Sequence, residues 1–264
     1  MENISEDERT KYCLRELRTL LRDERNLDCP MDDEFLVRFV RARKYNADAA
    51  FRNLKMYYRI RLKHPDSFSR LYPTELQRVL DSGVVSVLNS RDDMNRKIFV
   101  FRVALWDPDC FSFEDVTMAC MLVAEEMTYC HESQRAGAIV VVDHHGLSMA
   151  HAKQLTVSGF RKLLQMFQDC FPAKYKAIHL VNQPYLFDIL FSIAKRFMSH
   201  KIQSRIHFHP DYCSLMRFLS PHIAAECLGG NLKEEDAWDA QLISRLYNKD
   251  KFYRDLLQYG YKAR

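Results

Sequence analysis

Residues 136–146 read Ala-Gly-Ala-Ile-Val-Val-Val-Asp-His-His-Gly and decide the fold class of this chain of 264 residues. The run 137–143 is apolar and β-branched but too short for a helix, so it predicts a buried strand. Apolar residues at helical spacing predict helices over 114–131 before it and over 149–170 after it. A buried strand between two helices is typical of a mostly parallel sheet that helices cover.

The same alternation of strands and helices continues on both sides of this stretch. Further strands are expected over 84–88, 97–103, 177–181 and 205–209, and a further helix over 185–198. This pattern predicts an α/β domain that spans residues 83–232.

The residues before Gly83 favour helices only. Ser5 and Glu8 have the spacing of a capping box, and further helical patterns cover 33–43, 48–63 and 71–80. We therefore expect an all-helical N-terminal module over residues 1–82. Residues 233–264 are expected to form a helical or partly ordered C-terminal tail.

Composition excludes several classes of function. The seven glycines have neither the spacing of a dinucleotide fingerprint nor that of a phosphate-binding P-loop, and no G-x-S-x-G nucleophile elbow is present. Seventeen Phe, 13 Tyr and 11 Met instead supply many large, deformable apolar side chains. The net charge of +4 is too mild to indicate a nucleic-acid binder.

Other features of the sequence indicate the cellular compartment in which the protein resides. The apolar runs are too short to span a membrane, and the acidic N-terminus lacks the apolar region of a signal peptide. The eight cysteines show neither a C-x-x-C pair nor zinc-binding spacing. We expect a cytosolic protein without disulfides.

Metal and catalytic chemistry have few candidates. The pairs His144–His145 and His207–His209 lack the further ligands that a zinc site requires. Asp143 ends a strand, where α/β folds place functional groups, but no acid, Ser or Cys partner is fixed beside it. Cys120 and Cys130 resemble small core residues. We interpret all of these as structural and expect no metal site and no catalytic residue.

The expected helix over 185–198 is apolar almost all round. Such a helix is either part of the core or a lid that closes a lipid-filled cavity and touches a bilayer. Basic residues flank it, namely Lys174, Lys176, Lys195, Arg196, Lys201 and Arg205. Each cation contributes about 1 kcal/mol near an anionic membrane, so this arrangement is typical of a membrane-docking surface.

Several motifs resemble the CRAL-TRIO family. Residues 33–45 and 57–61 are similar to its N-terminal helical part, and residues 136–146 to its central strand and turn. Three further stretches resemble its lipid-binding domain: 171–176, 178–184 and 201–209. The resemblance covers about residues 10 to 232 and is to the branch of the α-tocopherol transfer protein and cellular retinaldehyde-binding protein.

The resemblance implies a cavity that holds one hydrophobic ligand, such as a retinoid, tocopherol or related isoprenoid, under a mobile lid helix at 185–198. The positions that would line it are Cys120, Ala124, Val140, Val142, Leu163, Phe167, Ile178, Phe187, Leu190 and Ile193. The resemblance also implies a site for phosphatidylinositol bisphosphate. The residues that would bind its headgroup are Arg61, Lys174, Lys176, Lys201 and Arg205.

These features together predict a non-enzymatic lipid-transfer or lipid-binding protein. It would be monomeric and cytoplasmic, transiently peripheral on membranes, and would need no cofactor. Two alternatives remain open: a phosphoinositide-binding adaptor of membrane trafficking, and an enzyme that uses Asp143 with the nearby histidines.

Overall fold

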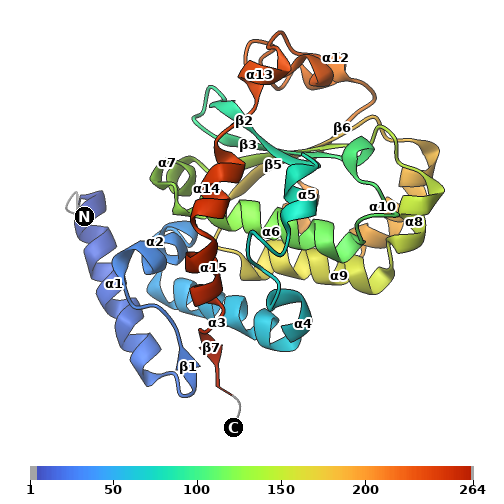
Figure 1. Cartoon of the computed structure of the whole chain (residues 1–264). Helices are drawn as coiled ribbons and strands as arrows, with labels where there is room; N and C mark the ends of the chain where they lie inside the picture. The colour runs from blue at the N-terminus through green and yellow to red at the C-terminus, as the bar shows by residue number, and fades with distance from the viewer. Residues whose placement is uncertain (1–4, 263–264) are drawn as a thin grey trace.

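A five-stranded sheet organises the structure, a computed structural model that describes residues 5–262 (Figure 1). Its strands are β2 (Val85–Arg91), β3 (Lys97–Arg102), β4 (Ala138–Asp143), β5 (Tyr175–Val181) and β6 (Ile206–His209), in that spatial order. β2 and β3 are antiparallel, and the other neighbours are parallel. The predicted α/β class with a mostly parallel sheet is confirmed.

Alternation along the strands separates the two faces of the sheet. Val140 and Val142 of β4 point to one face, while Ile139 and Val141 point to the other and are buried. On the first face lie α6 (Phe113–Tyr129), α9 (Val157–Gln165) and α10 (Tyr185–Lys195). On the second face lie α12 (Tyr212–Leu215) and η3 (Glu226–Leu228).

The single helix expected over 149–170 is wrong. The segment forms α8 (Met149–Gln154), α9 and a π-helical turn, η2 (Met166–Cys170). The hydroxyl of Thr156 accepts a hydrogen bond from the Gly159 N–H at 3.1 Å and so caps a new helix after the break. The helix expected at 71–80 is also shorter, since only α5 (Gln77–Asp81) forms there.

The N-terminal module contains α1 (Glu6–Asp23), α2 (Asp33–Ala42), α3 (Ala47–Lys63) and α4 (Pro65–Phe68). Leucines of α1 and aromatic residues of α2 and α3 form its core. The expectation of helices only is incomplete, because β1 (Leu27–Asp28) pairs with β7 (Gly260–Tyr261) from the other end of the chain. The sequence signal for strands as short as these two is weak.

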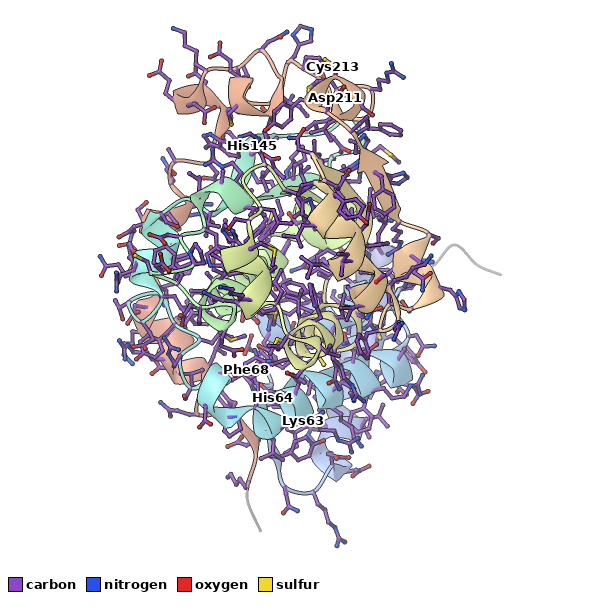
Figure 2. All side chains as sticks on the ribbon, turned by 90° about the vertical axis from the view of Figure 1, so that its right-hand side faces the viewer. Lys63, His64, Phe68, His145, Asp211 and Cys213 are labelled. Atoms are coloured by element: carbon purple, nitrogen blue, oxygen red, sulfur yellow. The ribbon has the colours of Figure 1, made fainter. Side chains whose placement is uncertain are left out.

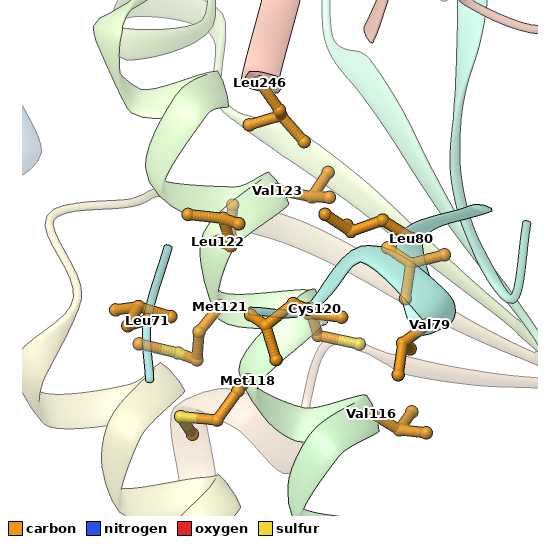
Figure 3. Packing of buried hydrophobic residues seen from close by; sticks show 14 of the residues in the cluster. Leu71, Val79, Leu80, Val116, Met118, Cys120, Met121, Leu122, Val123 and Leu246 are labelled. Atoms are coloured by element: carbon orange, nitrogen blue, oxygen red, sulfur yellow. The ribbon is translucent and has the colours of Figure 1, made fainter. Parts of the chain in front are cut away.

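The C-terminal tail connects the two parts of the molecule. It forms α13 (Glu234–Ala237), α14 (Leu242–Asn248) and α15 (Asp250–Leu256) and runs from the sheet to the helical module (red in Figure 1). Figure 3 shows Leu246 of α14 above Leu122 and Val123 of α6. The tail is therefore packed into the main hydrophobic core. The remaining short helices are η1 (Val103–Leu105), α7 (His131–Ala136) and α11 (His200–Gln203).

A buried carboxylate joins the helical module to the α/β domain. Glu125 of α6 accepts from Arg38 Nη1 at 2.5 Å and from the Tyr57 hydroxyl at 2.9 Å. Arg61 Nη2 lies 3.4 Å from its other oxygen. The side chains of Arg38 and Glu125 are 0% and 2% exposed, so neither charge has access to water.

Replacing Glu125 with Gln should therefore destabilise the protein strongly, because it leaves the buried Arg38 without a counter-charge. We expect the free energy of unfolding to fall by about 3–5 kcal/mol, measured by urea denaturation. Glu132→Gln is the matched control, since Glu132 pairs with Arg91 but its side chain is 62% exposed. Its expected loss is about 0–1 kcal/mol. Equal losses in the two variants would contradict the role assigned to Glu125.

Candidate functional site

An apolar cavity of about 300 Å³ lies between the first face of the sheet and helices α6, α9 and α10. This volume is at the lower end of the range found for small-molecule sites. Of its 28 lining residues, all but Thr117, His144, Gln168 and Tyr175 are apolar. The arrangement is suited to an apolar molecule and offers few polar contacts.

The structure brings nine of the ten expected cavity residues to this wall. They are Cys120, Ala124, Val140, Val142, Leu163, Phe167, Ile178, Phe187 and Leu190. Ile193 lies half-buried on α10 and does not line the cavity. Several further aromatic and apolar residues also line it, among them Phe99, Trp106 and Phe160. Their pattern in the sequence does not differ from that of ordinary core residues.

Helix α10 covers the cavity with one face and exposes the other. Phe187, Leu190 and Ala194 are buried at helical spacing, whereas Tyr185 is 84% and Ile189 53% exposed. Figure 2 views the molecule from the side on which α10 lies in Figure 1. The helix is thus not an internal core helix, and its apolar residues include some that face solvent. The expected extension to residue 198 is wrong, since the helix ends at Lys195.

Three of the four polar lining residues have protein partners. The Thr117 hydroxyl donates to the Phe113 carbonyl at 2.7 Å. Gln168 donates from Nε2 to the Phe197 carbonyl and accepts from the Ser199 N–H, which ties η2 to the segment after α10. The Nδ1 atom of His144 lies 3.2 Å from the Val181 carbonyl. The fourth, the Tyr175 hydroxyl, is buried and has no partner in the described part of the chain.

The histidines and Asp143 are held in structural contacts. His179 Nδ1 lies 2.8 Å from His209 Nε2, and the His179 ring stacks on that of His207. Within residues 5–262, no group of three or more His, Cys, Asp or Glu is arranged to hold a metal ion. Asp143 accepts hydrogen bonds from Asn182, the Tyr212 hydroxyl and the His145 N–H. Its carboxylate thus holds together the segments that follow β4, β5 and β6.

Six cations form a second feature, which we call the basic cluster: Arg43, Lys44, Lys174, Lys176, Lys201 and Arg205. Partial burial lowers the pKa of Lys201, and the nearby charges of Arg205, Arg43, Lys44 and Lys176 lower it further. Burial likewise lowers the pKa of Lys174, with Lys176 and Lys44 as the next causes. Such mutual repulsion favours the binding of an anion.

Two backbone positions of unusual conformation lie beside or within the basic cluster. Gly137 adopts φ +89°, and a Cβ atom there would lie 2.4 Å from the Lys174 carbonyl oxygen. After α2 the chain turns through left-handed Lys44, with φ 54°. Arg43 and Lys44 were not expected at this site, because they precede Lys174 by far in the sequence and only the tertiary fold brings them together.

Arg61 makes its contacts with Tyr57 of α3 and Glu125 of α6. Its guanidinium lies 3.4 Å from the centre of the Tyr57 ring and pairs with Glu125. Its assignment to a phosphoinositide site stays a prediction from the resemblance. None of the helices in the described residues is long and apolar enough to cross a membrane.

Comparisons with known proteins agree with this geometry. The family model for the CRAL/TRIO domain matches residues 81–230. Clavesin-1 from Xenopus laevis is 35% identical over 227 residues, which cover 84% of this chain and 68% of that protein. Alpha-tocopherol transfer protein-like from Homo sapiens is 33% identical over 246 residues, 92% of this chain and 71% of that protein.

A solved structure shares the fold. The alignment with the crystal structure of Sfh5 covers 94% of this chain and 99% of the Sfh5 chain. It has a TM-score of 0.61 and a sequence identity of 14%. The sheet, its helices and the apolar cavity define an α/β domain preceded by a helical module. The chain belongs to the CRAL/TRIO family.

The buried histidine beside the cavity makes stability depend on pH. Burial lowers the pKa of His144 from 6.5 to about 4, so it stays neutral in the folded chain while the unfolded chain binds a proton below pH 6.5. The free energy of unfolding should therefore decrease as the pH is lowered from 6.5 toward 4. His144 contributes about 1.4 kcal/mol per pH unit at most.

Between pH 6 and 5, unfolding of the wild type should take up close to one proton at His144. We expect His144→Gln to remove this proton uptake and so to weaken the dependence of the free energy of unfolding on pH. Urea denaturation at both pH values measures this difference. Thr117→Val is the control, because it alters the same cavity wall without removing a titratable group, and it should leave the dependence unchanged. An unchanged dependence in His144→Gln would contradict the assignment.

Proposed function

We propose that this protein binds one hydrophobic molecule of the retinoid, tocopherol or related isoprenoid type and transfers it between membranes. The observation that carries the proposal is the apolar cavity beneath α10, with 24 of its 28 lining residues apolar. Burial of each CH₂ group stabilises such a complex by about 0.8 kcal/mol, so release of a long isoprenoid into water is slow. A binding protein of this kind needs a membrane surface for exchange.

Two surface features support exchange at an anionic membrane. Tyr185 and Ile189 expose apolar groups on α10 directly over the cavity. The exposed Lys201 of the basic cluster follows α10, and its neighbour Ile202 lines the cavity. A phosphatidylinositol bisphosphate headgroup in the basic cluster would thus lie beside the end of α10. Its binding would favour movement of α10 as a lid and exchange of the cargo.

The content of the cavity tests this proposal. Lipid extracted from the protein purified from its native cells should contain an isoprenoid such as a retinoid or tocopherol, identified by mass spectrometry. A phospholipid alone would contradict the proposal. That result would favour an adaptor that reads phosphoinositides as a signal.

Filling the cavity should block cargo binding without unfolding the protein. Leu163→Trp adds ring volume to the cavity wall and should weaken binding of retinol by about tenfold or more, in a fluorescence titration. The control is Arg161→Trp, which places the same side chain on an exposed position of α9. Retinol affinity should be unchanged in this control. Equal affinities in both variants would show that the cargo binds elsewhere.

The basic cluster should act on transfer and leave the cavity unaffected. Lys201→Ala with Arg205→Ala removes two cations and about 2 kcal/mol of attraction to anionic lipid. Transfer of cargo between vesicles that contain phosphatidylinositol bisphosphate should slow by about tenfold or more. Cargo binding in detergent should not change.

A charge-matched control separates this local effect from the loss of net charge. Lys233→Ala with Lys251→Ala also removes two exposed cations, from positions outside the basic cluster. This variant should keep the wild-type transfer rate. A wild-type rate in Lys201→Ala with Arg205→Ala would rule out the headgroup role.

A further inference from the structure

We propose that the Tyr175 hydroxyl recognises a single polar group at one end of the cargo. The proposal rests on the cargo-binding function proposed above and narrows its chemical class. The cargo would be an apolar molecule that ends in a hydrogen-bond acceptor, such as an alcohol, ether or carbonyl. A plain hydrocarbon would be disfavoured relative to it.

The first support is the hydrogen-bond state of the cavity wall. Among the four polar lining residues, Thr117 and Gln168 have their polar groups satisfied by backbone partners. One ring nitrogen of His144, Nδ1, is within hydrogen-bond distance of the Val181 carbonyl oxygen. Tyr175 is different, because its hydroxyl is buried without a partner in the described residues. A buried donor that makes no hydrogen bond is unfavourable, and a ligand acceptor would relieve this cost.

The immediate surroundings of Tyr175 do not satisfy its hydroxyl. The Glu125 carboxylate is near, but it makes no hydrogen bond to Tyr175 and already accepts from Arg38 and Tyr57. Its ring packs edge-on against Phe167, with centroids 5.9 Å apart. The nearby Cys120 thiol is protonated, because burial raises its pKa to about 12, and a thiol is a weak acceptor. The side chain therefore combines an apolar wall with one unused donor.

The position of Tyr175 in β5 indicates how the cargo is oriented. Lys174 and Lys176 of the basic cluster flank it in the sequence. Its side chain lines the cavity together with Ile178 and Leu180, because the pairing of β4 with β5 shifts register between Tyr175 and Ala177. Its backbone carbonyl accepts a hydrogen bond from Arg205. The polar end of the cargo would thus lie beside the basic cluster. The apolar end would extend toward Trp106 and Leu147, beyond the carboxyl ends of β3 and β4.

Three matched C15 isoprenoids test the proposal: farnesol, its methyl ether and the hydrocarbon farnesene. Their affinities are measured by displacement of diphenylhexatriene from the full-length protein. The wild type should bind farnesol and the ether about five- to tenfold more tightly than farnesene. Tyr175→Phe should remove this preference while it binds farnesene at least as well as the wild type, which also shows that the variant is folded.

Tyr129→Phe is the matched control, because it also removes a buried tyrosine hydroxyl that has no partner in the described residues, at a position that does not line the cavity. It should keep the preference for the alcohol and the ether. The proposal would be overturned if Tyr175→Phe still preferred farnesol and its ether over farnesene. It would also be overturned if, of the two variants Tyr175→Phe and His144→Phe, only His144→Phe lost this preference. Failure of all three compounds to displace diphenylhexatriene from the wild type would instead contradict the proposed cargo-binding function itself.

Discussion

The ion pair between Arg38 and Glu125 fixes helix α6 in the centre of the molecule, and most other contacts depend on where α6 lies. The next residue, Glu126, accepts from Lys249 Nζ at 2.8 Å and from the Tyr253 hydroxyl at 2.6 Å, both from the tail. Two successive acids thus hold the helical module on one side and the C-terminal tail on another. Cys120 and Ala124 of the same helix line the cavity. A helix buried in this way can be apolar almost all round and still be uniquely placed by its two charges.

The fold class was predictable from local pattern, but several connections were not. The run 137–143 indicates a buried strand because it is β-branched and short, and β4 forms there. The break at Thr156 was missed because the apolar periodicity continues across it and only the hydroxyl cap marks the new helix. The pairing of β1 with β7 depends on contact between the two ends of the chain, which no local pattern contains.

The candidate site, like the fold, was predictable from the sequence only in part. The family resemblance led to nine residues that line the cavity, whereas the partly exposed Ile193 lies off it. Arg43 and Lys44 come to the basic cluster from the helical module, and Tyr175 differs from a core tyrosine only by its missing hydrogen bond. Both observations need tertiary coordinates. β5 then joins the two features, since Tyr175, Ile178 and Leu180 line the cavity and Lys176 belongs to the cluster.

The short ribbon of β1 and β7 has a consequence for the order in which the chain acquires its structure. Residues 27–28 leave the ribosome well before their strand partner at residues 260–261 is synthesised. The helical module therefore emerges before the α/β domain and waits for the backbone hydrogen bonds of this ribbon until residues 260–261 are available. Closing so long a loop costs conformational entropy, which the packing of α14 and α15 in the main hydrophobic core helps to offset. Completion of the helical module is thus coupled to folding of the α/β domain and the tail.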